Sequence, residues 1–169
     1  SQEELKTINF SGVSGPVTVT AYYEEPFASA GANLTKTLNV VRTYEVNGKT
    51  TTTLSEGQTV TVRLHPVLSA EKDKSGYEII DTLPTGLLPM ARLNYEYFYC
   101  GKGSGGCGLS ASSVEGQRVS FHYYTGNKDI TYIARVVSKG KFKAEPAVIQ
   151  AVSNSTRLNI SDSSVIEIK

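Results

Sequence analysis

Short runs in which apolar and polar residues alternate are the feature that most constrains the fold of this chain. The alternation runs through residues 34–46, 59–65 and 129–138. A side-chain period of two is that of a β-strand with one face buried. Turn signals such as Asn47-Gly48 recur about every 8–12 residues, and no helical period of useful length is present. The sequence therefore predicts an all-β fold, an antiparallel β-sandwich of roughly ten short strands.

Length and charge narrow the classes of protein to consider. The chain has 169 residues, of which 39% are hydrophobic and 20% charged, which suits one domain or one domain with a short appended piece. The net charge is +1, so we expect no nucleic-acid partner. No run of about 18 apolar residues is present, so we expect no membrane span in this chain.

The stretch from Tyr77 to Met90 holds the sharpest turn signal. An apolar strand over 77–80 runs into Asp81, Pro84 turns the chain, and Gly86 is expected to adopt a positive φ. Asp81 before a Leu-Pro turn is expected to cap backbone N–H groups rather than to catalyse a reaction.

Two cysteines, Cys100 and Cys107, bracket a Gly-rich loop. They could act as a nucleophile, a metal pair or a disulfide. A structural zinc site needs four ligands, and a cysteine nucleophile needs a base that no adjacent histidine supplies here. We therefore favour a disulfide, which is compatible with an oxidised, exported protein.

An aromatic cluster surrounds this loop. Residues 93–99 and 118–124 are predicted to pair as a hairpin whose tip runs from Cys100 to Gly116. Cross-strand aromatic packing explains the cluster first, and an aromatic binding surface is the second interpretation. The cluster consists of Tyr95, Tyr97, Tyr99, Tyr123 and Tyr124.

No catalytic or metal-binding constellation is evident. His65 and His122 have no Cys, Asp or Glu at metal-ligand spacing, so a structural role is favoured for each. The carboxylates Asp81, Glu78 and Glu145 do not form a convincing acid/base set. We expect no enzyme activity, no cofactor and no metal.

Four segments follow one another in a recognisable order: Leu38 to Tyr44, Leu54 to Leu64, Ile80-Asp-Thr-Leu-Pro-Thr-Gly-Leu, and Ile130-Thr-Tyr-Ile-Ala-Arg through Lys-Gly-Lys-Phe to Glu-Pro-Ala. Together they resemble the C-terminal macroglobulin-like domain of bacterial alpha-2-macroglobulins. In that family an Asp-x-Leu-Pro-Ala-Gly turn precedes a strand reading Tyr-x-Ala-Arg, then Gly-x-Phe and Pro-Pro-Ala. The resemblance covers about Leu34 to Lys169 and implies a macroglobulin-like, fibronectin/immunoglobulin-like sandwich.

What the resemblance implies about chemistry depends on a motif that lies elsewhere in such proteins. Family members trap proteases, and in many a buried thioester in another domain, with a Cys-x-x-Gln-type motif, captures the attacker. No such motif is present here, so this chain cannot form the thioester itself. Members often place Met-Tyr after the penultimate strand, where this chain has Val152-Ser153, and the Cys100–Cys107 loop resembles an insertion. The parent is therefore expected to be a trap or a thioester-free scaffold.

The sequence predicts two parts: residues 1–28, a first strand pair or the tail of a preceding domain, and residues 34–169, the sandwich domain.

The expected role is a non-catalytic structural domain of an extracytoplasmic bacterial alpha-2-macroglobulin-like protein of the protease-trap type. Its partners would be neighbouring domains of the parent chain, and proteases. The alternative is an adhesin-type surface module that binds a host protein or glycan. The residues expected to hold the structure are Asp81, Pro84, Gly86, Arg135 and Gly140.

Overall fold

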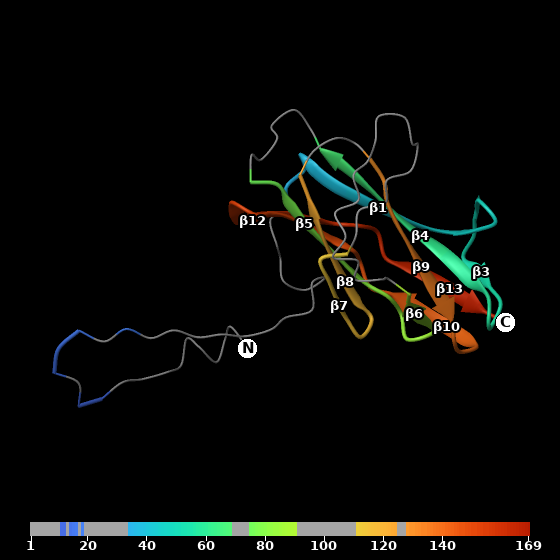
Figure 1. Ribbon diagram of the computed structural model, residues 1–169. Coiled ribbons are helices and arrows are strands. Elements are labelled where there is room, and N and C mark those ends of the chain that lie inside the picture. The colour runs from blue at the N-terminus through green and yellow to red at the C-terminus, as the bar shows by residue number, and fades with distance from the viewer. Residues whose placement is uncertain are drawn as a thin grey trace. The chain divides into compact units, whose positions relative to one another are not determined.

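The computed structural model describes residues 11, 12, 14–16, 18, 34–68, 75–90, 111–124 and 128–169. The chain divides into two units, Ser1–Ala32 and Asn33–Lys169. Every described strand belongs to the second unit (Figure 1). Residues 1–28 lie almost entirely outside the described residues, so their assignment stays a prediction.

Thirteen β-strands follow one another in the described part of the second unit, with no helix among them. They are β1 (Leu38–Val46), β2 (Lys49–Thr50), β3 (Thr53–Leu54), β4 (Thr59–Leu68), β5 (Tyr77–Thr82), β6 (Leu87–Pro89), β7 (Ser113–Glu115), β8 (Arg118–Tyr123), β9 (Ile130–Val136), β10 (Gly140–Ala144), β11 (Val148–Ala151), β12 (Asn154–Ile160) and β13 (Ser164–Ile168).

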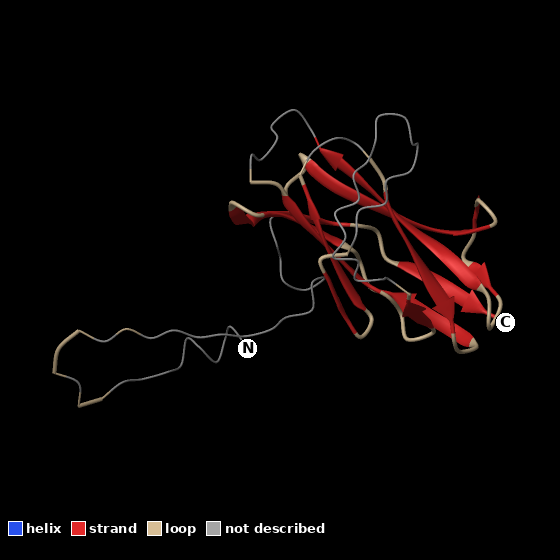
Figure 2. Ribbon diagram, viewed as in Figure 1, coloured by secondary structure: helices blue, strands red, loops and turns tan. Residues whose placement is uncertain are grey.

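The strands form three sheets. The β4 sheet has the order β2-β1-β4-β9-β6, and the β5 sheet has the order β12-β11-β5-β8-β7. These two sheets form the layers of a sandwich (Figure 2). A smaller β13 sheet has the order β10-β13-β3, and its β13–β3 pair is parallel, whereas the other described pairs are antiparallel. The predicted all-β sandwich is confirmed.

One hydrophobic core fills the space between the two layers. Period-two alternation turns Val62 and Leu64 of β4 inward, where both are fully buried. Ile79 and Phe121 enter from the β5 sheet. The Phe121 ring lies 5.6 Å, centroid to centroid, from the ring of Tyr132 on β9. Burial of each such side chain contributes about 1.5–3 kcal/mol, which is why the alternation dictates the register.

The turn predicted at Asn47-Gly48 is confirmed, and it joins the two strands of a hairpin. Asn47 and Gly48 have φ values of 51° and 74°, and they join β1 to β2. Positive φ at both central residues is the signature of a type I′ turn, whose twist matches that of paired strands.

Strand β12 is not predicted by the pattern of the sequence. Residues 154–160 form β12, which pairs with β11 and accepts a hydrogen bond at the Leu158 carbonyl from the Thr35 N–H, 2.8 Å away. Its first three residues, Asn154 to Thr156, are exposed and polar. An edge strand with both faces near water shows no alternation, so this strand was not visible in the sequence.

The turn after β5 is confirmed, but the predicted conformation of Gly86 is wrong. The Leu87 N–H donates to the Pro84 carbonyl at 2.8 Å, which closes the turn. The φ of Gly86 is not positive. A glycine is needed there for space, because a Cβ would lie 2.6 Å from Ile168 Cδ1 and 2.6 Å from Phe142 Cε2.

The position of Tyr123 contradicts the interpretation that it belongs to an aromatic binding surface. Its side chain is 1% exposed in the core, and its hydroxyl accepts a hydrogen bond from the Lys128 N–H at 3.0 Å. Tyr124, by contrast, is 63% exposed. The predicted hairpin tip also contains strand β7. Five residues of the predicted aromatic cluster and disulfide lie outside the described residues: Tyr95, Tyr97, Tyr99, Cys100 and Cys107.

Candidate functional site

A buried polar cluster crosses the sandwich between the two layers. Arg42 on β1 forms an ion pair with Asp81 on β5, and their side chains are 1% and 0% exposed. Arg42 also donates to the Glu145 carbonyl at 2.5 Å. The Tyr132 hydroxyl on β9 donates to the second oxygen of Asp81 at 2.6 Å. The guanidinium carbon of Arg42 lies 5.5 Å from the centroid of the Tyr44 ring.

Burial raises the pKa of both tyrosines of this cluster. Burial raises the pKa of Tyr132 well above its ordinary value, and the negative charge of Asp81 raises it further. Burial also raises the pKa of Tyr44. Burial is the largest single influence on Arg42 and lowers its pKa, but the charge and hydrogen bond of Asp81 together with the nearby Tyr44 and Tyr132 outweigh it, so the pKa is raised.

The cluster joins the two sheets, and its carboxylate is fully engaged within it. Each Asp81 oxygen accepts a hydrogen bond from a side chain, and neither is exposed. The predicted role of Asp81 as a cap of the following turn is therefore wrong, because its donors are side chains from the facing sheet. The Tyr44 hydroxyl is buried and, among the described groups, has no hydrogen-bond partner.

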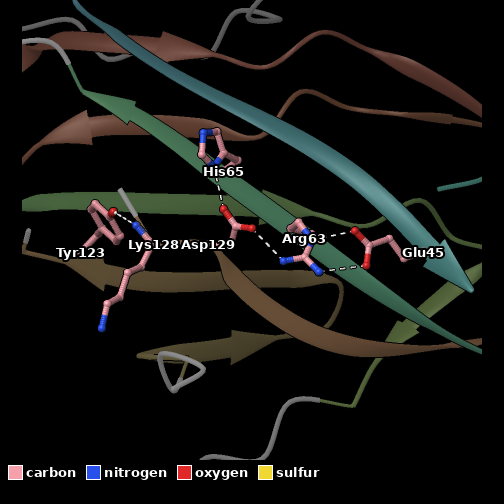
Figure 3. Close-up of polar contacts among 6 residues, drawn as sticks. All are labelled: Glu45, Arg63, His65, Tyr123, Lys128 and Asp129. Carbon is pink, nitrogen blue, oxygen red and sulfur yellow. Dashed lines mark hydrogen bonds and ion pairs between the residues drawn. The ribbon is translucent and has the colours of Figure 1, made fainter. Parts of the chain in front are cut away.

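A second polar network lies on the outer face of the β4 sheet (Figure 3). Arg63 on β4 holds Glu45 on β1 through two bonds of 2.6 and 3.0 Å. The same guanidinium donates to Asp129 at 2.7 Å. The other Asp129 oxygen lies 2.6 Å from Nδ1 of His65. Four residues from three segments thus form one continuous chain of contacts.

The pKa values of the carboxylates follow from these contacts. The hydrogen bond from His65, followed by that from Arg63, lowers the pKa of Asp129. Hydrogen bonds from Arg63 lower the pKa of Glu45. Both contacts favour the charged carboxylate.

An Asp–His pair of this kind can orient an imidazole as a base, but a base needs a nucleophile beside it. In the part of the chain that the structure describes, Asp129 is the polar partner recorded for His65. His122 is exposed on β8, opposite Glu78 of β5. Nowhere among the described residues do three His, Cys, Asp or Glu side chains gather in a manner suited to a metal ion.

The remaining predicted structural residues fall in different environments. Pro84 is buried in the turn after β5. Gly140 begins β10 with a φ of 143°, a conformation that favours glycine. Arg135 lies on β9 with its side chain exposed, so it does not belong to the core. The described residues include no helix long and apolar enough to cross a membrane.

Arg42, Arg63, Asp129 and Tyr132 were not among the predicted site residues. One signal could have found the buried pair. Arg42 occupies an inward position in the alternation of β1, and a charged residue at a core position implies a buried partner of opposite charge. The partner's identity depends on how β1 and β5 face each other, which no local pattern shows.

Comparison with known proteins agrees with this architecture. The family model of the bacterial alpha-2-macroglobulin MG10 domain matches residues 31–154. The chain belongs to this family. The resemblance found in the sequence is thereby confirmed, and the β4–β5 sandwich with its buried Arg42–Asp81 pair is an MG10-type domain.

Solved structures of similar fold include alpha-2-macroglobulins of Escherichia coli and Salmonella. The chain matches Escherichia coli alpha-2-macroglobulin from domain MG7 to the C-terminus with a TM-score of 0.61 and 17% identity, over 80% of this chain and 24% of that one. It matches the Escherichia coli protein activated by porcine elastase with a TM-score of 0.64 and 16% identity, over 83% of this chain and 14% of that one. It matches the Salmonella protein reacted with methylamine with a TM-score of 0.61 and 16% identity, over 83% of this chain and 10% of that one.

This chain therefore spans about a quarter or less of the length of these solved chains. At such identities the likeness establishes the fold. No curated protein matches the chain in sequence.

Proposed function

We propose that this chain is the MG10 domain of an exported bacterial alpha-2-macroglobulin-like protein of the protease-trap type. Its role is structural and non-catalytic: it packs against neighbouring domains of its parent chain. The observation that carries the proposal is the family match over residues 31–154. A chain that matches only a small part of each solved protein fits a module within a larger assembly.

The geometry of the polar groups supports a non-catalytic role. Asp81 is fully buried, and both of its oxygens are engaged by Arg42 and Tyr132. Such a cluster joins β1, β5 and β9 and fixes how the two sheets face each other. A catalytic carboxylate needs a face open to substrate, which Asp81 lacks.

The partners and location of the parent are part of the same proposal. Proteases are its proposed targets, which is supported by the description of an Escherichia coli neighbour as activated by porcine elastase. An extracytoplasmic location follows from that role, because a trap must meet proteases outside the cytoplasm. The adhesin alternative is weakened by Tyr123, which lies in the core rather than in an aromatic surface.

Size-selective inhibition tests the proposal. The purified parent protein is incubated with elastase or trypsin, and residual activity is measured on a small chromogenic peptide and on a large protein substrate. A trap leaves cleavage of the small peptide intact while cleavage of the large substrate falls. Equal activity on both substrates, with and without the parent protein, would overturn the proposal. Pre-treatment with methylamine then separates a thioester-dependent trap from a thioester-free one.

A further inference from the structure

Three large apolar side chains are exposed together on the outer face of the β4 sheet, where it ends at strand β6. Leu88, Met90 and Ile133 are 50%, 50% and 49% exposed. Met90 follows β6 directly, and its N–H donates to the carbonyl of Ile133 on β9 at 2.8 Å, so the two residues lie side by side. Exposed apolar residues scattered singly need no explanation, but a contiguous group marks an interaction surface.

Arg135 lies within this group. It is exposed on β9, two residues from Ile133 on the same face, and its cross-strand partner on β6 is Leu88. On its other side it faces Thr59 of β4. We call the four residues Leu88, Met90, Ile133 and Arg135 the Arg135 corner.

Arg135 differs from the other arginines of the β4 sheet in its charge partners. Arg42 is paired with Asp81, and Arg63 is paired with Glu45 and Asp129. Within the described part of the chain, no carboxylate pairs with Arg135. A planar guanidinium with apolar neighbours suits a carboxylate from outside, because the apolar rim excludes water and strengthens the pair.

Strand β6 offers a partner side chains rather than a ladder of backbone hydrogen bonds. It is three residues long, and its last residue is Pro89, which has no N–H to donate. A proline on a short edge strand opposes addition of a further strand. Contact at this corner therefore depends on the exposed side chains.

We propose that the Arg135 corner docks against a neighbouring domain of the parent chain, which supplies a carboxylate to Arg135 and apolar side chains around it. The inference rests on the proposed function and adds the face that docks and the chemistry of its partner. Charge complementarity at Arg135 argues for an acidic partner surface. The small share of each solved relative that the chain covers argues that such a surface lies in the same polypeptide.

Met90 provides the test, because it is the one methionine in the sequence. Hydrogen peroxide converts an accessible methionine to its sulfoxide, and peptide mapping by mass spectrometry locates the added oxygen. The rate of Met90 oxidation is compared between this 169-residue chain and the native full-length parent. We expect oxidation to be slower by roughly tenfold in the parent, because the corner is covered there.

Charge reversal in the parent protein tests the role of Arg135. Arg135→Glu is expected to restore fast oxidation of Met90, and Arg135→Lys to restore it only in part. The matched control is Arg118→Glu, which reverses an exposed charge on β8 of the other sheet and should leave the rate unchanged. Circular dichroism of each variant confirms that the fold is retained.

Equal oxidation rates in the chain and in the native parent would overturn the docking proposal. Protection that appears in the 169-residue chain itself and grows with its concentration would also overturn it, in favour of a second copy as the partner. Neither result bears on size-selective inhibition, which is scored without reference to Met90. Failure of the docking site and failure of the proposed function are therefore distinguishable.

Discussion

Replacement of Asp81 by alanine should be the most damaging single change in the polar interior. It leaves the Arg42 guanidinium buried without its counter-charge and the Tyr132 hydroxyl without its acceptor. Breaking one side of a buried ion pair costs about 3–5 kcal/mol. Domains of this size are stable by about 5–15 kcal/mol, so the variant should lose roughly a fifth of its stability or more.

Urea unfolding followed by far-UV circular dichroism measures this loss, since the chain has no tryptophan for fluorescence. The matched control is Thr82→Ala, an exposed neighbour on the same strand, which should stay within about 0.5 kcal/mol of wild type. A triple variant, Arg42→Met, Asp81→Leu and Tyr132→Phe, removes the whole polar cluster at once. It should recover at least about 2 kcal/mol relative to Asp81→Ala, because it leaves no buried charge unpaired.

Two results would refute this reasoning. One is a loss of less than about 1 kcal/mol in Asp81→Ala, which is the range of an ordinary neutral hydrogen bond. The other is a triple variant that is less stable than Asp81→Ala, because that would locate the cost in lost packing rather than in the unpaired Arg42.

Three further predictions concern single positions. Gly86→Ala should lower stability by about 1–3 kcal/mol in urea unfolding, because its Cβ would overlap the Phe142 ring, and the additional change Phe142→Ala should reduce the penalty. Tyr44→Phe should leave stability unchanged or raise it by up to about 1 kcal/mol, since its buried hydroxyl has no hydrogen-bond partner among the residues that the structure describes; a loss of more than about 1 kcal/mol contradicts the assignment. The contact with His65 lowers the pKa of Asp129, so this group stabilises the fold above its ordinary pKa of about 3.9 and the contribution is lost as pH falls below it. Asp129→Asn should therefore be less stable than wild type near neutral pH, and the gap should close in acid.

The elements that the sequence predicted well are those with one face buried. In β4 and β9, alternation at period two reflects a physical constraint, because a slip of one residue would turn the core side chains to water. The Asn47-Gly48 turn was equally readable, because few other dipeptides tolerate positive φ at both positions. Strand β12 escaped prediction because its first residues are exposed on both faces.

The polar clusters were the least predictable part of the molecule. Asp81 and Arg42 are 39 residues apart in sequence, and only the facing of two sheets brings them together. Asp129 and His65 are separated by 64 residues and meet through the pairing of β4 with β9. Local patterns report which face a residue occupies, whereas such pairs depend on how separate strands are placed in space.

The most direct test of the central claim is removal of residues 34–169 from the parent protein, scored by size-selective inhibition of a protease. We predict that the intact parent blocks cleavage of a large substrate but spares a small peptide. The shortened protein, still folded by circular dichroism, should lose this selectivity, because its remaining domains no longer have the MG10 domain to pack against. Full selectivity in the shortened protein would contradict a structural role for this domain in the trap.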